Sequence, residues 1–237
     1  MENDIFKREE LLIGKENLEK LQQKTVAVFG LGGVGSYVVE GLARAGIGNF
    51  ILIDSDKIDI TNINRQIIAL KSTVGKYKTD VEEERIKEIN PKAKVIAYKE
   101  FIEKEGNEEL FNTIKNVDYI VDAIDTVSAK IRIIEFANEN NVKIISALGT
   151  GNKLNPTKLK IADINETKIC PLAKVIRKEL RKRNITKLDV VYSEEEPIKN
   201  SDKIIGSISY VPSIAGLLIS YKIVGLFLGT PPKNSFI

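Results

Sequence analysis

The sequence predicts an α/β fold: a Rossmann-like, mostly parallel sheet with helices on both faces, extended by a mixed C-terminal part. Short apolar runs alternate with amphipathic helical patterns over the first 150 residues, a rhythm typical of parallel strands joined by right-handed crossovers. A glycine-rich turn follows one of these runs, as in nucleotide-binding βαβ units. No linker or internal repeat divides the chain. We therefore expect a single domain over residues 1–237, with halves 1–150 and 151–237.

The elements follow from the spacing of apolar residues. In the first half we expect strands at Val26–Phe29, Phe50–Ile53, Val95–Tyr98, Tyr119–Val121 and Ile144–Ser146, and helices around Val38–Ala45, Val81–Ile89 and Ile131–Asn138. In the second half we expect strands at Leu159–Ala162 and Val190–Tyr192, helices at Pro171–Arg183 and Val211–Leu228, and a mobile loop from Glu194 to Asp202.

Composition excludes several kinds of chemistry. The chain has 237 residues, 43% of them hydrophobic, a net charge of +3, no histidine and one cysteine. A Ser-His-Asp or Cys-His arrangement and a zinc site of paired cysteines are therefore excluded. Any chemistry must use carboxylates, lysines, arginines, backbone dipoles or a metal held by oxygen.

The first ten residues and the most apolar stretch of the chain indicate its cellular location. The first ten residues are charged and have no apolar core, so they do not form a secretory signal. The stretch Ile204–Tyr221 has the length to span a bilayer, but it contains Pro212 and several serines, which favours a buried core helix. We expect a cytoplasmic protein without a membrane segment.

The glycine turn is the strongest local signal. Gly30, Gly32 and Gly35 fit G-x-G-x-x-G between a strand and a helix, where phosphates approach backbone N–H groups at the helix N-terminus. Gly33 lies within the same turn. Asp54 ends the next strand, where a carboxylate can accept hydrogen bonds from ribose hydroxyls. Asp56 is either part of this site or a surface turn residue.

An NAD-dependent dehydrogenase fits the turn and Asp54 equally well, so the next residues decide. Asn62, Asn64 and Arg65 lie together, and Lys78 follows at the same expected edge of the sheet. Arg65 can bind phosphate oxygens with two hydrogen bonds, and Lys78 can neutralise a leaving pyrophosphate. The alternative is that these are solvated surface residues.

Two carboxylates follow the strand that ends at Val121. Asp125 is the better candidate for Mg²⁺, which prefers a carboxylate together with phosphate oxygens and water. Asp122 either shares this role or caps the following turn.

Together these residues resemble the ubiquitin-activating-enzyme-like superfamily of adenylating proteins, the ThiF/MoeB/HesA group, from Arg8 to Leu228. The resemblance implies that ATP and Mg²⁺ are bound. The glycine turn would hold phosphates, Asp54 the ribose, Asn62 and Arg65 the triphosphate, Lys78 the reacting phosphate and Asp125 the metal. It also implies a homodimer, with dimerisation and substrate binding in the second half, in which Arg8 reaches the partner's nucleotide.

Within that group the chain is most similar to the tRNA threonylcarbamoyladenosine dehydratase branch. The similarity lies in Asn64–Leu70, Asn155–Thr157, Pro171–Arg181, Val190–Glu194 and Val211–Gly216. It implies ATP-dependent activation of the threonylcarbamoyl carboxylate on the adenosine beside the anticodon, followed by cyclising dehydration. Cys170 departs from the branch, in which we expect an acidic residue at this position. The sequence leaves open whether a sulfur-transfer protein is a further partner.

A basic segment supports an RNA substrate. Residues 168–187 contain eight Lys or Arg against one Glu, a local charge of +7. On a helix the cationic side chains would lie away from the apolar face and be available to phosphates. These are Lys174, Arg177, Lys178, Arg181 and Lys182. The alternative is an ordinary solvated helix face.

Three further interpretations remain. The chain could adenylate the C-terminus of a ubiquitin-like sulfur-carrier protein, although it lacks paired C-x-x-C motifs. It could be a non-catalytic nucleotide-binding sensor, in which Arg65, Lys78 and Asp125 have no catalytic role. Cys170 could be a catalytic thiol at a helix N-terminus, but a buried structural cysteine is the commoner case.

Overall fold

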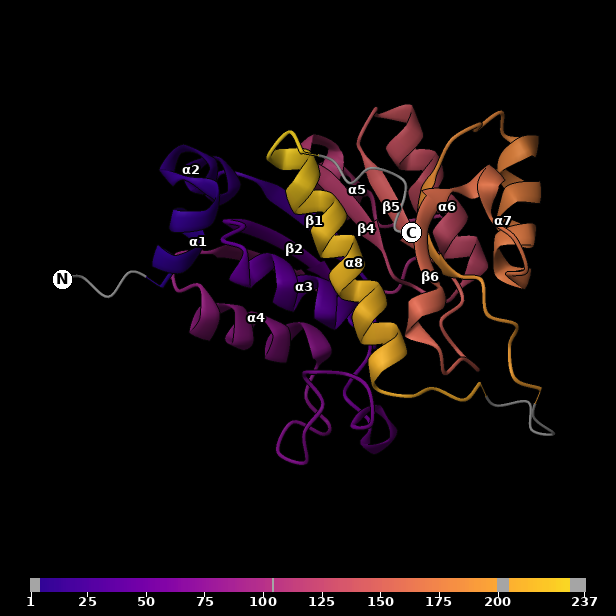
Figure 1. Cartoon of the computed structure of the whole chain (residues 1–237), viewed down its shortest axis with the longest axis horizontal. Helices are drawn as coiled ribbons and strands as arrows, with labels where there is room; N and C mark the ends of the chain where they lie inside the picture. Colours follow the sequence, from indigo (N-terminus) through magenta and orange to yellow (C-terminus); the bar gives the residue numbers. More distant parts are fainter. Residues whose placement is uncertain (1–4, 104, 200–204, 231–237) are drawn as a thin grey trace.

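The computed structural model describes residues 5–103, 105–199 and 205–230 and contains one seven-stranded sheet (Figure 1). The strand order is β3-β2-β1-β4-β5-β7-β6, and only β6 runs antiparallel, pairing with β7. The predicted α/β fold with a mostly parallel sheet is confirmed. The strands are β1 Thr25–Phe29, β2 Asn49–Ile53, β3 Lys94–Tyr98, β4 Tyr119–Asp122, β5 Ile144–Ala147, β6 Leu159–Asp163 and β7 Asp189–Ser193.

The helices include every one that the sequence predicted and three that it did not. The confirmed ones are α3 Gly35–Arg44, α4 Lys78–Ile89, α6 Val127–Glu139, α7 Pro171–Lys182 and α8 Tyr210–Phe227. The additional ones are α1 Lys7–Ile13, α2 Lys15–Gln22 and α5 Glu108–Thr113. These three have only 7, 8 and 6 residues, which is too short for an apolar helical period to be recognised in the sequence.

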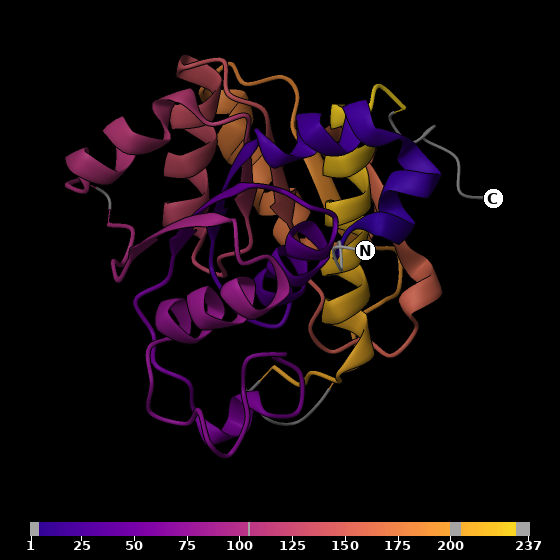
Figure 2. The ribbon, with the colours of Figure 1, turned by 90° about the vertical axis from the view of Figure 1, so that its left-hand side faces the viewer.

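Helices cover both faces of the sheet. Alternate residues of β1 point to opposite sides: Val26 and Val28 belong to the core under α3 and α8, whereas Ala27 and Phe29 belong to the core under α5 and α6. Figure 2 shows α8 on one side of the sheet and α5 and α6 on the other. The near-continuous apolar strands are explained by burial on both faces.

Helix α8 is the apolar stretch that had the length of a membrane span. The helix is long and apolar enough to cross a membrane, but half of its 18 residues are buried inside the fold. It crosses α3 closely: a Cβ on Gly216 would lie 2.5 Å from the backbone oxygen of Val34, and the Ser220 hydroxyl donates to Val38 O at 3.1 Å. Within this fold α8 is therefore a core helix, as expected.

The second half of the chain completes the sheet of the first. Strand β7 pairs in parallel with β5, and β6 then forms the edge. The functional division at residue 150 stays a prediction. We expected a mobile loop from Glu194 to Asp202. Its beginning is instead hydrogen-bonded to another segment, because the Glu195 carboxylate accepts from the N–H groups of Leu154 and Asn155. Its residues 200–202 lie outside the described part of the chain.

Candidate nucleotide site at the carboxyl edge of the sheet

The glycine turn joins β1 to α3 and is built tightly against β4. Gly30 has φ +84°, and a Cβ there would lie 2.7 Å from Ala123 O. A Cβ on Gly35 would lie 1.7 Å from Gly30 O. At Gly32, in contrast, the nearest atom to an added Cβ is Gln66 Nε2 at 3.8 Å. The turn therefore has two glycines required by packing and one that faces open space, as a phosphate cradle needs.

Asp54 lies directly beneath this turn at the end of β2. One carboxylate oxygen accepts from Leu31 N at 2.7 Å and the other from Asp56 N at 2.8 Å. Burial raises the pKa of Asp54, opposed by the Lys78 ammonium and by these two N–H groups. The carboxylate thus ties β2 to the glycine turn, and each oxygen keeps a second lone pair for a ligand hydroxyl.

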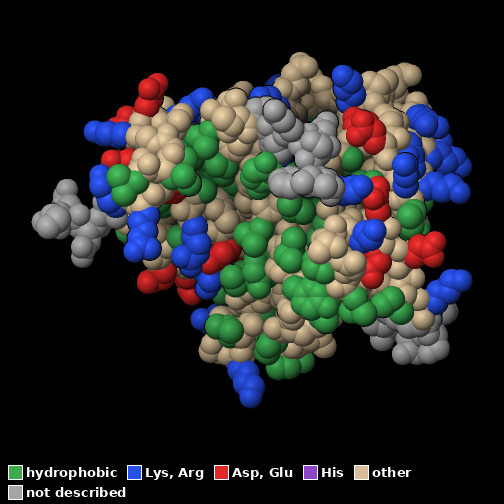
Figure 3. All heavy atoms as spheres, in the orientation of Figure 1, with side chains coloured by type: hydrophobic (Ala, Val, Ile, Leu, Met, Phe, Trp, Pro, Cys, Tyr) green, Lys and Arg blue, Asp and Glu red, His purple; other side chains and the backbone are tan. Residues whose placement is uncertain are grey.

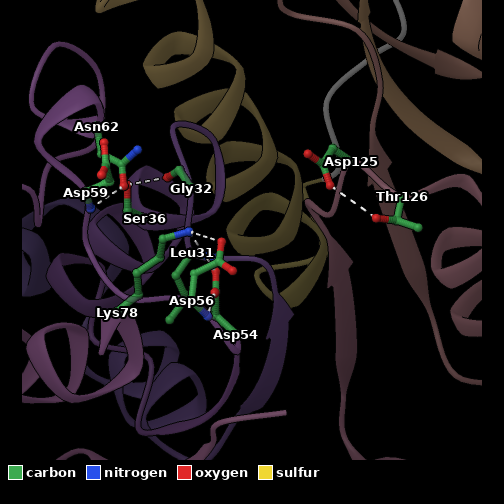
Figure 4. A network of polar contacts seen from close by, with 10 residues as sticks. All are labelled: Leu31, Gly32, Ser36, Asp54, Asp56, Asp59, Asn62, Lys78, Asp125 and Thr126. Atoms are coloured by element: carbon green, nitrogen blue, oxygen red, sulfur yellow. Dashed lines mark hydrogen bonds and ion pairs between the residues drawn. The ribbon is translucent and has the colours of Figure 1, made fainter. Parts of the chain in front are cut away.

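Lys78 begins α4 and points back toward the same edge, as Figure 4 shows. Its side chain is only 7% exposed, and Nζ lies 2.7 Å from Asp56 Oδ2 and 3.6 Å from Asp54 Oδ2. Asp56, whose side chain is 65% exposed, therefore holds the lysine at the rim. The buried ammonium is positioned beside the glycine turn, where an anionic ligand would compete with Asp56 for it.

The segment between β2 and α4 supplies the amides and the arginine. Asn62 Oδ1 accepts from Asp59 N at 3.0 Å, which closes a 3-10 turn at Ile60–Asn62. Arg65 Nη1 donates to Asn64 Oδ1 and Thr61 O, both at 2.9 Å. An added Cβ on Gly33 would lie 3.4 Å from Arg65 Cγ. Arg65 is therefore packed on the glycine turn, whereas Asn62 serves its own turn.

Asp125 lies in the loop after β4, on the other side of the glycine turn from Lys78 (Figure 4). It is exposed, and its carboxylate accepts from Thr126 Oγ1 at 3.4 Å. Among the described residues no group of three or more Asp, Glu, Cys or His side chains could hold a metal. Asp125 therefore fits Mg²⁺ only together with phosphate oxygens and water, which would complete the shell.

Asp122 does more than cap the following turn. Its Oδ1 accepts from Ile124 N at 3.3 Å, as one alternative expected, but its Oδ2 also pairs with Lys130 Nζ at 3.0 Å. Lys130 additionally donates to Ala147 O at 2.8 Å. This fully buried pair fastens the ends of β4 and β5 to α6 and so supports the loop that carries Asp125.

Beyond β5 the edge continues with residues that the sequence did not single out. Lys153 is 3% exposed, its ammonium donates to Glu195 O, and burial lowers its pKa. Cys170 caps α7: its Sγ accepts from Ala173 N at 3.5 Å, and the residue is 4% exposed. This placement favours the structural interpretation of Cys170.

Arg8 lies away from the glycine turn of its own chain. It is an exposed residue of α1. The neighbouring Phe6, together with Leu18, packs against Gly46, which follows the C-terminal end of α3. Because the glycine turn is at the other end of this ten-residue helix, Arg8 cannot complete the site from within one chain.

The basic segment forms helix α7, and its Lys and Arg side chains gather on that side of the molecule (Figure 3). Arg177 is not available as we expected, because its guanidinium donates to the backbone oxygens of Ile164 and Thr167 at 3.3 and 3.0 Å. Lys182 pairs with Glu179 at 2.6 Å. Lys174, Lys178 and Arg181 are exposed and form no ion pair within the described residues.

Sequence reasoning missed Gln66, Lys130 and Lys153. Gln66 is 6% exposed and lies against Gly32, and its Oε1 has no hydrogen-bond partner in the described part of the chain. It directly follows Arg65, which was the only available hint. The lysines are buried through tertiary packing, and neither lies in a motif.

Comparison with known proteins agrees with this geometry. The model of the ThiF family matches residues 6–236. A tRNA threonylcarbamoyladenosine dehydratase of Bacillus subtilis is 44% identical over 92% of both chains, and one of Escherichia coli is 36% identical over 72% of this chain and 63% of that one. The crystal structure of the E. coli dehydratase TcdA with ATP superposes with a TM-score of 0.87 at 31% identity, covering 94% of this chain and 93% of that one.

Proposed function

Because the chain belongs to the ThiF family, we propose that it is an ATP-dependent tRNA threonylcarbamoyladenosine dehydratase. The observation that carries the proposal is the grouping at one sheet edge. Gly32 is an open position, Arg65 packs on the neighbouring Gly33, and Lys78 and Asp125 lie on opposite sides of the turn. This arrangement suits a triphosphate. The similarity to named dehydratases along the whole chain supports the choice of substrate.

The reaction needs only the groups that the chain has. The threonylcarbamoyl carboxylate attacks the α-phosphorus of ATP, and pyrophosphate leaves. The carbamoyl group of the same side chain then attacks the activated carboxyl carbon. AMP leaves with the carboxylate oxygen, and one carbamoyl N–H proton is released to solvent. Substrate supplies both nucleophiles, so the absence of histidine is no obstacle. The protein aligns the groups, neutralises pyrophosphate with Arg65 and Lys78, and keeps water away.

Nucleotide contacts follow from the positions in the site. Backbone N–H groups of Gly32 and Gly33 hold phosphates, and Asp54 holds the ribose. Gly30 and Gly35 shape the turn, since the N–H of Gly30 already donates to Ile53 O at 2.8 Å. Asn64 positions Arg65, from which its Oδ1 accepts a hydrogen bond at 2.9 Å. Asn62 closes its own turn through Oδ1, so its Nδ2 is the group that extends the triphosphate site. Asp56 acts through Lys78, with which it pairs. Asp125 holds Mg²⁺, which neutralises phosphate charge when bound.

Arg8 supports a homodimer in this proposal. Each Arg8 completes the partner's nucleotide site, which agrees with its distance from the glycine turn of its own chain. Leu11 and Leu12 of α1 are 77% and 85% exposed, and hydrophobic side chains gather over α8 (Figure 3). Such exposed apolar surface marks an interface. A mixture of Arg8→Ala and Lys78→Met proteins should regain activity, because one site of the mixed dimer is intact.

Transfer RNA binds along α7 through Lys174, Lys178 and Arg181, with Lys182 adding charge. The enzyme works in the cytoplasm, where its tRNA substrate is found. Whether a sulfur-transfer protein is a further partner stays an open part of this proposal. Adenylation of a ubiquitin-like carrier protein is the second candidate, since it uses the same nucleotide site, but the charge of α7 favours RNA.

The test is ATP–pyrophosphate exchange with threonylcarbamoyl-modified tRNA, together with mass spectrometry of the nucleoside. We expect RNA-dependent exchange and loss of one water from the modified adenosine. Exchange that needs a carrier protein and ignores RNA would replace this proposal with the second candidate. Asp125→Ala should abolish exchange and leave thermal unfolding unchanged, whereas retained exchange would remove Asp125 as the metal ligand.

A further inference from the structure

A cavity lies beside the basic helix, outside the nucleotide site. It has a volume of about 330 Å³ and opens between α7 and two turns at residues 164–165 and 184–186. Its floor consists of the buried aliphatic side chains of Ile164, Leu180 and Ile185. Its rim is polar and exposed: Asn165, Arg181, Asn184 and Thr186.

The rim is preformed. Asn165 Nδ2 donates to Thr186 O at 2.8 Å, which ties the two turns together. Arg177 holds the first turn from below through the backbone oxygens of Ile164 and Thr167. The side chains of Arg181, Asn184 and Thr186 form no hydrogen bond within the described residues. The cavity therefore combines a buried apolar floor with unengaged polar groups at its edge.

This combination matches an unpaired nucleobase. A base has apolar faces and a polar edge, so aliphatic and planar groups contact the faces while amides and hydroxyls bind the edge. An adjoining phosphate would meet Arg181, the cation on the rim. We propose that this cavity receives one splayed base of the anticodon loop, apart from the adenosine that is modified. The inference rests on the proposed function, in which tRNA is the substrate.

The position of α7 sets the distance along the RNA. Its N-terminal cap, Cys170, touches Gly149 just after β5: an added Cβ on Gly149 would lie 3.5 Å from Cys170 Sγ. β5 is two strands from β1 and the glycine turn. From Cys170 to Arg181 the helix rises about 16 Å, at about 1.5 Å per residue. Two strand spacings of about 4.8 Å add about 10 Å, so the path from the glycine turn to Arg181 is at most about 26 Å. At roughly 3.4 Å per stacked nucleotide, the base lies within about eight nucleotides of the modified adenosine.

The experiment fills the cavity and measures RNA binding over a range of salt concentrations. Thr186→Phe places a ring from the exposed rim over the floor, and Asn112→Phe, on an exposed position of α5, is the matched control. We expect Thr186→Phe to weaken binding of modified tRNA about tenfold, the size of one lost base contact, with an unchanged salt dependence. Lys178→Ala should instead reduce the salt slope.

Abasic substitutions in an anticodon stem-loop give a second readout on the parent protein. One loop position should lose affinity about tenfold when its base is removed, and Thr186→Phe should be insensitive to that same removal. Equal sensitivity of both proteins, or equal weakening by Asn112→Phe, overturns the inference and leaves the cavity to an acidic protein segment. If the parent fails to dehydrate modified tRNA, the proposed function itself fails.

Discussion

Lys130 Nζ lies 3.0 Å from Asp122 Oδ2, and both side chains are almost completely excluded from solvent. Lys130→Met would leave the Asp122 carboxylate buried without its cation, which costs about 3–5 kcal/mol. We therefore expect a large loss of stability in urea denaturation. The double variant Lys130→Met, Asp122→Asn should recover part of it, because no charge is left buried. A double variant as unstable as the single one would show that the pair contributes only packing.

The glycine turn allows packing to be separated from ligand binding. At Gly35 an added Cβ would lie 1.7 Å from a backbone oxygen, whereas at Gly32 it would meet only open space and the end of Gln66. Gly35→Ala should therefore lower the melting temperature strongly or prevent folding. Gly32→Ala should melt like the parent and bind ATP at least tenfold more weakly in calorimetry, a change of about 1.4 kcal/mol. Undiminished ATP affinity would place the phosphates elsewhere.

Lys78 and Asp56 form one ion pair, but we assign them different roles. Lys78→Met should reduce ATP–pyrophosphate exchange about 10²–10³-fold, the usual effect of removing one group that stabilises developing charge. Asp56→Asn should cause a much smaller loss, since it frees the ammonium for phosphate. The comparison is made on exchange rates at saturating ATP. If Asp56→Asn is as damaging as Lys78→Met, Asp56 itself contacts the nucleotide.

Some site residues follow strands or lie in a motif, and these could be predicted from the sequence. Others reach the site only through tertiary packing, and these could not. The glycine turn, Asp54, Arg65 and Asp125 come directly after strands or in a compact motif, so strand order brings them to one edge. Lys130 and Lys153 reach that edge only through the packing of α6 and of the loop after β5. The sequence predicts Arg177 as a phosphate ligand. In the structure its guanidinium donates instead to the backbone oxygen of Ile164. The spacing of residues along a helix shows which face a side chain is on, but it does not show which other segment packs within its reach.

Glu82, on α4 one turn after Lys78, provides a test of pH dependence. It is 0% exposed, and neither carboxyl oxygen has a hydrogen-bond partner within the described residues. Burial raises the pKa of Glu82 well above its usual 4.5; Glu40 and Asp54 raise it further, and Arg85 opposes them. The protonated acid is therefore favoured in the folded state. Its contribution to stability is present below pH 4.5 and is lost as pH rises toward the folded pKa.

Glu82→Gln removes this titration and keeps the shape of the side chain. The variant should gain stability relative to the parent as pH rises from 5 to 8, by more than about 1 kcal/mol, because one pKa unit corresponds to about 1.4 kcal/mol. The measurement is urea denaturation at both pH values. Glu84→Gln, at an exposed position of the same helix, should show no such gain. An equal difference between Glu82→Gln and the parent at pH 5 and pH 8 would mean that Glu82 is ionised in the folded protein throughout, and hence that a cation accompanies it in solution.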